Sequence, residues 1–95
     1  MTVTARDVIK VLFEYGGEMT GHDFFQELKK ECNITECTPN KAKWYDYRCL
    51  LLSALQVAGI IDMWTDEDGV RYYQLDSDVS YTLLQIQRGI IKTEE

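Results

Sequence analysis

The chain has 95 residues, of which 45% are hydrophobic and 12% aromatic, and its 16 acidic and 10 basic side chains give it a net charge of −6. A chain of this length and composition supports one hydrophobic core and excludes two independent domains, a disordered protein and a low-complexity protein. It has neither the charged head and apolar run of a signal peptide nor an apolar run as long as a membrane span. We therefore expect a single cytoplasmic domain, or a nuclear one in a eukaryote, without a membrane partner.

The first two predicted helices begin at capping residues. Thr4 precedes "ARDVIKVLFEY", whose apolar residues recur at helical spacing, and Gly16 and Gly17 end that helix. Thr20 has an acidic residue three positions later and resembles a capping box before "GHDFFQELKKEC". The link between the helices, residues 18–19, is expected to be extended. The predicted buried residues are Val8, Val11, Leu12 and Tyr15 in the first helix and Phe24, Phe25, Leu28 and Cys32 in the second.

The third predicted helix has the clearest start signal in the chain. Thr38 is followed by Pro39, which is typical of an N-cap residue with proline in the first helical position. The helix is expected to run for about twenty residues, to Gly59. Its basic residues all lie in the front half, whereas residues 50–58 are almost wholly apolar and are expected to pack into the core. The predicted buried stripe consists of Trp44, Tyr47, Leu51, Leu55 and Ala58.

A change of period after Gly59 predicts a β-hairpin. The runs "IIDMW" and "VRYYQL" are strand-like, and they are joined by "TDEDG", in which Asp68 and Gly69 form a strong turn signal. A last helix is then expected, with several N-cap candidates between Asp76 and Asp78. Its apolar residues recur at intervals of four, three and four: Val79, Leu83, Ile86 and Ile90.

This order of three helices, a hairpin and a helix resembles a winged helix-turn-helix domain. The region "LLLSALQVAGIIDMWTDEDGVRYYQL" is similar to the winged-helix pattern at Leu55, Gly59, Ile60, Ile61, Arg71, Tyr72, Tyr73 and Leu75. The region "GGEMTGHDFFQELKKE" is loosely similar to PadR-like transcriptional regulators at Gly21, His22 and Leu28. The resemblance implies a mainly α fold with a three-helix core, a two-stranded wing and a C-terminal helix. Within one domain over residues 1–95, the helix-turn-helix would cover about residues 20–58, the wing about 60–75 and the last helix about 77–92.

The resemblance further implies a transcriptional regulator that binds double-stranded DNA by placing its third helix in the major groove. The residues suited to phosphate and base contacts are Asn40, Lys41, Lys43, Tyr45, Arg48 and Arg71. Residues 38–58 carry three basic side chains and one acidic one, a net +2, which is the sign that DNA requires. The predicted wing, residues 62–71, carries four acidic side chains and one basic one, a net −3, so its tip would repel phosphates.

The last helix predicts a homodimer. Its apolar stripe is wider than a helix that covers only its own small domain needs, and a wider apolar face favours a second chain. The resemblance to PadR-like regulators, in which the C-terminal helix forms the dimer interface, implies the same use. The residues predicted for this interface are Val79, Leu83, Ile86 and Ile90. The alternative is that the last helix lies over the apolar part of the third helix.

A second function stays open beside DNA binding. It is an acidic winged-helix protein-interaction module, such as a viral or mobile-element factor that binds a host protein through Asp66, Glu67 and Asp68, although acidic turns also occur in hairpins without partners. No enzyme is expected, because the chain lacks a nucleophile–base set, a glycine-rich phosphate loop and metal-spaced carboxylates. His22 and the three cysteines are not expected to bind zinc, since Cys49 is predicted to lie alone in mid-helix. We expect neither a metal nor a cofactor.

Overall fold

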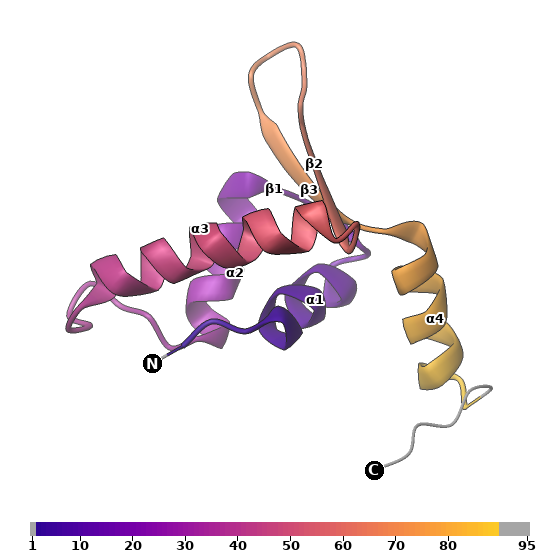
Figure 1. The fold of residues 1–95 in the computed structure, drawn as a ribbon, viewed down its shortest axis with the longest axis horizontal. Helices are drawn as coiled ribbons and strands as arrows, with labels where there is room; N and C mark the ends of the chain where they lie inside the picture. Colours follow the sequence, from indigo (N-terminus) through magenta and orange to yellow (C-terminus); the bar gives the residue numbers. More distant parts are fainter. Residues whose placement is uncertain (1, 90–95) are drawn as a thin grey trace.

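The computed structural model describes residues 2–89, and these form four helices and three strands (Figure 1). In chain order the elements are α1 (Ala5–Glu14), β1 (Glu18–Thr20), α2 (Gly21–Glu31), α3 (Lys41–Val57), β2 (Ile61–Thr65), β3 (Arg71–Leu75) and α4 (Ser77–Gln87). The strands form one antiparallel sheet in the order β1-β3-β2. The chain is therefore a small α/β domain with a three-stranded antiparallel sheet, and the expected mainly helical fold with a β-hairpin agrees with it.

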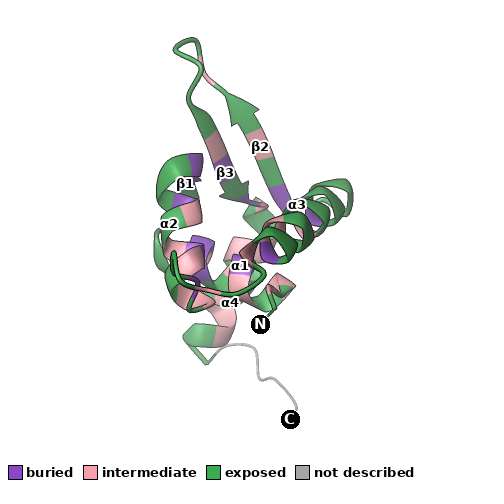
Figure 2. Cartoon of the chain, turned by 90° about the vertical axis from the view of Figure 1, so that its left-hand side faces the viewer, coloured by how far each residue is buried: buried purple, intermediate pink, exposed green. Residues whose placement is uncertain are grey.

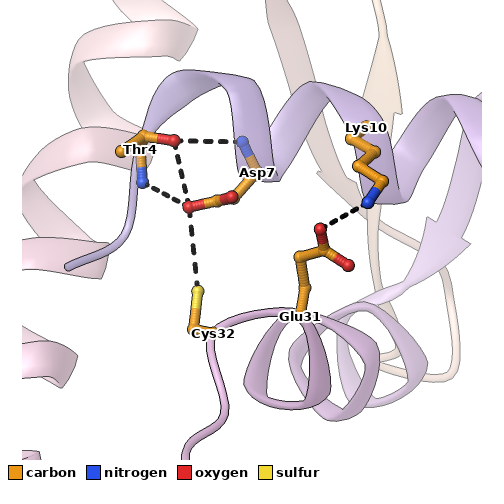
Figure 3. A network of polar contacts seen from close by, with 5 residues as sticks. All are labelled: Thr4, Asp7, Lys10, Glu31 and Cys32. Atoms are coloured by element: carbon orange, nitrogen blue, oxygen red, sulfur yellow. Dashed lines mark hydrogen bonds and ion pairs between the residues drawn. The ribbon is translucent and has the colours of Figure 1, made fainter. Parts of the chain in front are cut away.

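The first two helices begin at the predicted caps. Thr4 Oγ1 accepts a hydrogen bond from the Asp7 amide at 3.2 Å, and the Asp7 carboxylate accepts one from the Thr4 amide at 2.9 Å, which completes a capping box (Figure 3). Thr20 Oγ1 accepts from the Asp23 amide at 3.3 Å at the start of α2. Only the threonine half of the predicted second box is formed, because no hydrogen bond from the Thr20 amide to the Asp23 carboxylate occurs in the described part of the chain.

The link predicted between the first two helices is a strand. Met19 pairs with Tyr73 and is buried, so β1 occupies the second edge of β3 and protects its backbone hydrogen-bonding groups. On the other edge, β2 and β3 form the predicted hairpin with Met63 opposite Tyr73. Asp66 closes its loop, since its Oδ1 accepts hydrogen bonds from the amides of Asp68 and Val70, both at 2.9 Å.

The core lies where α1, α2, α3 and the base of the sheet meet (Figure 2). Its largest fully buried side chains are Trp44, Phe24, Leu12, Leu28, Leu75 and Val8. Tyr73 joins the sheet to α2, because its ring lies 5.1 Å from that of Phe24 and 5.4 Å from that of Phe25. Tyr15, predicted to be buried, is instead exposed at the end of α1, while Phe25 and Cys32 are half-buried.

The predicted start of the third helix is wrong by two residues. α3 begins at Lys41, and the residue before it, Asn40, has a φ of 57° and makes no side-chain cap. Asparagine tolerates this left-handed conformation better than most residues. The Thr38 hydroxyl accepts instead from the Thr35 amide at 2.8 Å. The tight turn over residues 35–38 thus uses the hydroxyl that the sequence pattern assigned to a helix cap.

The buried face of α3 is rotated from the predicted one. Trp44 and Leu55 are buried as expected, but Leu52 is buried in place of Tyr47, and Ala58 is exposed. The apolar back half does not all pack into the core, since the exposed fraction is 68% for Leu50 and 90% for Val57. The rest of the domain covers only one side of α3. Because apolar residues occur on more than one side of this helix, their periodicity alone could not predict which of them are buried.

The last helix lies beside α1 and not over α3 (Figure 1). Val79 and Leu83 contact the core, yet no described residue of α4 is fully buried. An apolar groove between the two helices has a volume of about 490 Å³ and is lined by Arg6, Ile9, Lys10, Phe13 and Leu83. Ile90, the last residue predicted for the stripe, lies outside the described residues.

Alanine substitutions should distinguish the two sides of α3. Leu55→Ala removes a buried side chain and is expected to lower the free energy of unfolding by about 2 to 5 kcal/mol. Leu50→Ala, a matched control in the same helix, removes an exposed side chain and should change that free energy by less than about 0.5 kcal/mol. Urea titrations followed by circular dichroism measure both. Equal losses at the two positions would contradict the observed inward face.

Candidate nucleic-acid interface

A groove opens between α2, α3 and the β2–β3 hairpin. It has a volume of about 240 Å³, and residues from all three parts line it. Two of these are Arg48 and Arg71, and none is an aspartate or a glutamate. The other lining residues are Phe25, Cys49, Leu52, Ser53, Gln56, Met63 and Tyr73. We call this feature the arginine groove.

The guanidinium group of Arg48 is surrounded by aromatic rings. Its Cζ atom lies 3.9 Å from the ring centroid of Phe25, 5.1 Å from that of Tyr45 and 5.6 Å from that of Trp44. Its Nε atom is buried and has no hydrogen-bond partner within residues 2–89, and no carboxylate of those residues lies within ion-pair distance. Cation–π contacts therefore hold the charge of Arg48 in place without neutralising it.

Arg71 reaches the arginine groove from the hairpin. It is the first residue of β3, and strand alternation places it on the same face of the sheet as Tyr73. Like Arg48, it forms no ion pair with any residue that the structure describes. Tyr72, which lies between Arg71 and Tyr73 in the strand, points to the opposite face of the sheet. Its ring stacks there on Trp64, with the two ring centroids 5.5 Å apart. The groove thus combines one arginine from a helix with one from a strand.

Tyr45 is the third of the predicted DNA contacts that the structure brings to this region. Its ring contacts Arg48, and the Lys29 Nζ atom lies 5.3 Å from the centroid of the same ring. Tyr45 therefore links a lysine of α2 to an arginine of α3. This part of the surface carries positive charge from two helices.

The other predicted contacts lie elsewhere on α3. Lys41 donates a hydrogen bond to Glu36 at 2.8 Å, and this contact raises the pKa of Lys41 and lowers that of the Glu36 carboxyl. Lys43 is exposed, but it lies five positions before Arg48, so the two side chains are about 140° apart around the helix. Asn40 ends the loop before the helix. The predicted set therefore divides, and only part of it lies at the arginine groove.

Acidic side chains gather on the opposite face of the sheet. A second hollow there, with a volume of about 380 Å³, is lined by Tyr15, Glu18, Met19, Thr20, Asp23, Gln26, Glu27 and Tyr72. A hydrogen bond with Glu27 raises the pKa of Tyr15, and the charge of Asp66 raises the pKa of Tyr72. Three acidic side chains thus line this hollow, whereas none of the residues that line the arginine groove is acidic.

Sequence reasoning did not assign a role to the polar residues of α3 that line the arginine groove. Cys49, Ser53 and Gln56 follow one another at helical spacing, which is the signal that places them on one side of the helix. Their side chains are small or uncharged, so a search for basic residues passes over them. Phe25 was predicted only as a core residue. Its contact with Arg48 joins α2 to α3, and the sequence does not show which residues of two different helices lie next to each other.

The outward side of α3 carries a separate apolar feature. Four apolar residues recur at intervals of three, four and three, and we call them the outer stripe: Tyr47, Leu50, Ala54 and Val57. All four are exposed. Around the helix they lie on the flank away from Cys49 and Gln56, so α3 presents different chemistry on its two exposed sides.

Comparison of the chain with models of protein families, with curated proteins and with solved structures found no match. None of the helices described over residues 2–89 is long and apolar enough to cross a membrane. Over the same residues, no three histidine, cysteine or acidic side chains are grouped so as to hold a metal ion.

The three free cysteines should differ in their rate of alkylation. Burial raises the pKa of the Cys32 thiol, and that thiol also donates to the Asp7 carboxylate at 3.9 Å (Figure 3). A raised pKa means less thiolate at neutral pH, so Cys32 should react several-fold more slowly with iodoacetamide than the exposed Cys37 and Cys49. Peptide mass spectrometry after timed quenching measures the three rates. Denaturant should abolish the difference, and a native Cys32 that reacts first would contradict the packing around it.

Proposed function

We propose that this chain is a winged helix-turn-helix domain that binds double-stranded DNA through the arginine groove. The observation that carries the proposal is the pair Arg48 and Arg71, which face one groove that contains no carboxylate. The order of the elements and the antiparallel order β1-β3-β2 support it, because a helix and a hairpin then flank the same surface.

The groove offers distinct groups for the two kinds of contact that DNA-binding proteins make. Arg48 and Arg71 supply charge for the phosphates, and phosphate contacts fix orientation. Ser53 and Gln56 supply a hydroxyl and an amide, which can bond base edges in the major groove, and glutamine pairs well with adenine. The proposed reading surface is therefore the side of α3 next to the hairpin, and it excludes the outer stripe.

The charge of the whole chain sets the expected strength of binding. A net charge of −6 opposes DNA, and one domain offers few unpaired basic side chains, so binding by a single domain should be weak and sensitive to salt. The exposed acidic residues Glu67 and Asp68 at the hairpin tip should keep that tip away from phosphates. We therefore propose that the hairpin approaches DNA with the face that carries Arg71.

A homodimer held by α4 would double the number of phosphate contacts. Its support is that no described residue of α4 is fully buried, while Leu83 faces an apolar groove shared with Ile9 and Phe13. An apolar helix face that its own domain leaves half covered is suited to a second copy. The interface is proposed to centre on Val79, Leu83 and Ile86, and the predicted contribution of Ile90 falls outside the described residues.

The second candidate function is a protein-interaction module, which the outer stripe favours. Exposed fractions of 54% for Tyr47, 68% for Leu50 and 90% for Val57 are large for aromatic and aliphatic side chains on one helix face. An amphipathic helix of another protein could pack on such a stripe. The acidic loop, proposed from sequence for this role, can contribute only Glu67 and Asp68 freely, because Asp66 is occupied in closing the loop.

Single arginine substitutions test the DNA proposal. Arg48→Ala and Arg71→Ala should each weaken binding to duplex DNA about tenfold and lower the slope of log affinity against log salt by up to about 1, because each removes a positive charge that contacts the phosphate backbone. Lys43→Ala, a matched control on the far flank of α3, should change the affinity less than about twofold. Fluorescence polarisation over a salt series measures affinity and slope, and circular dichroism confirms that each variant folds.

Removal of the acidic charges of the hairpin loop is a second test of the DNA proposal, with the opposite expected effect on affinity. Glu67→Gln combined with Asp68→Asn should strengthen DNA binding and leave the loop intact, since Asp66 is kept. If a protein partner uses this loop, the same change should reduce that interaction and leave DNA unaffected. Wild-type binding no tighter than millimolar to any duplex at low salt would reject the DNA proposal and favour the interaction module.

The proposed dimer is tested by charge on α4. Leu83→Glu with Ile86→Glu should convert a dimer into a monomer, because it places four carboxylates in one apolar interface. Tyr81→Glu is the control, since Tyr81 is exposed on the other side of the same helix. Analytical ultracentrifugation of all three proteins at tens of micromolar measures their masses. A monomeric wild type would remove the dimer and the two-half-site geometry that it implies.

A further inference from the structure

Arg48 carries a charge that the described part of the domain does not balance. Three aromatic rings pack around its guanidinium group, its Nε atom is buried without a partner among those residues, and no carboxylate there forms an ion pair with it. A partly desolvated charge without a counter-charge is costly, and an anion from outside the chain would relieve that cost.

The arginine groove has the size and the donors for one small anion. Its volume of about 240 Å³ is below the range of about 300 to 1,000 Å³ that is usual for sites of drug-sized ligands. Its two arginines, Arg48 and Arg71, each carry several N–H donors, and Ser53 and Gln56 beside them stay available for base edges. A tetrahedral phosphate group, with several acceptor oxygens, suits this set better than a chloride ion.

We infer that the arginine groove is a discrete site for a single phosphate group and that Phe25 is the positioning residue for Arg48. The Phe25 ring is the nearest of the three, at 3.9 Å, and it comes from α2. An arginine already stacked in the free protein loses less rotamer freedom when it binds than one that moves in solvent. The inference deepens the proposed function and rests on it for the source of the phosphate, which would be the DNA backbone.

The test follows the Arg48 side chain directly by nuclear magnetic resonance. In ¹⁵N-labelled protein, the Arg48 Nε–H signal should shift saturably on titration with inorganic phosphate at constant ionic strength and should not shift with chloride. Phe25→Leu should weaken phosphate binding about threefold to tenfold, whereas Phe25→Tyr, which keeps a ring, should stay within about twofold of wild type. Arg48→Lys keeps the charge but loses the planar fork, and should bind phosphate at least about threefold more weakly when the titration is followed by the Arg71 Nε–H signal of the same groove.

The outcomes separate this inference from the proposed function. A saturable phosphate shift without duplex binding would support the site and reject DNA as the source. Duplex binding that leaves the Arg48 signal unmoved would overturn the inference, and DNA binding would then stand only through a surface other than the arginine groove. No shift with either probe, or a shift that grows without saturation, also overturns it. If folded Phe25→Leu binds phosphate as wild type does, the positioning role is wrong.

Discussion

The packing of Tyr73 against Phe24 and Phe25 is the contact on which the rest of the structure depends. Tyr73 sits in the central strand and pairs with Met19 on one side and Met63 on the other, so it joins all three strands to α2. Aromatic groups of this size contribute much of the buried area of a small core. The same Phe25 ring supports the Arg48 guanidinium, and so one aromatic cluster connects the core to the arginine groove.

Strand alternation separates the charges of this acidic chain. Arg71 and Tyr72 are neighbours in sequence, yet their side chains lie on opposite faces of the sheet. One face leads to the arginine groove, and the other leads to the hollow lined by Glu18, Asp23 and Glu27. The net charge of −6 therefore describes the whole molecule, whereas the residues that line the arginine groove include two arginines and no acidic side chain.

Two apolar surfaces stay uncovered by the described residues, and they have different structural causes. The outer stripe is exposed because α3 contacts its own domain along one side only, centred on Trp44 and Leu55. The surface of α4 is exposed because that helix leaves the sheet beside the end of α1 (Figure 1). Since the two surfaces belong to different helices, assembly through α4 and binding of another protein to α3 need not compete.

The sequence by itself determined the kind and order of the helices and the hairpin, through caps such as Thr4 and Thr20 and through the change of period after Gly59. These signals are local, and the structure contains each of those elements, although α3 begins two residues later and α4 ends at Gln87, about five residues earlier, than predicted. Only the tertiary structure decided that residues 18–20 form a strand, which face of α3 is buried, and that Arg48 and Arg71 share a groove with Phe25. Each of these depends on contacts between segments far apart in the chain, and the spacing of residues within one segment carries no information about which neighbour will cover it.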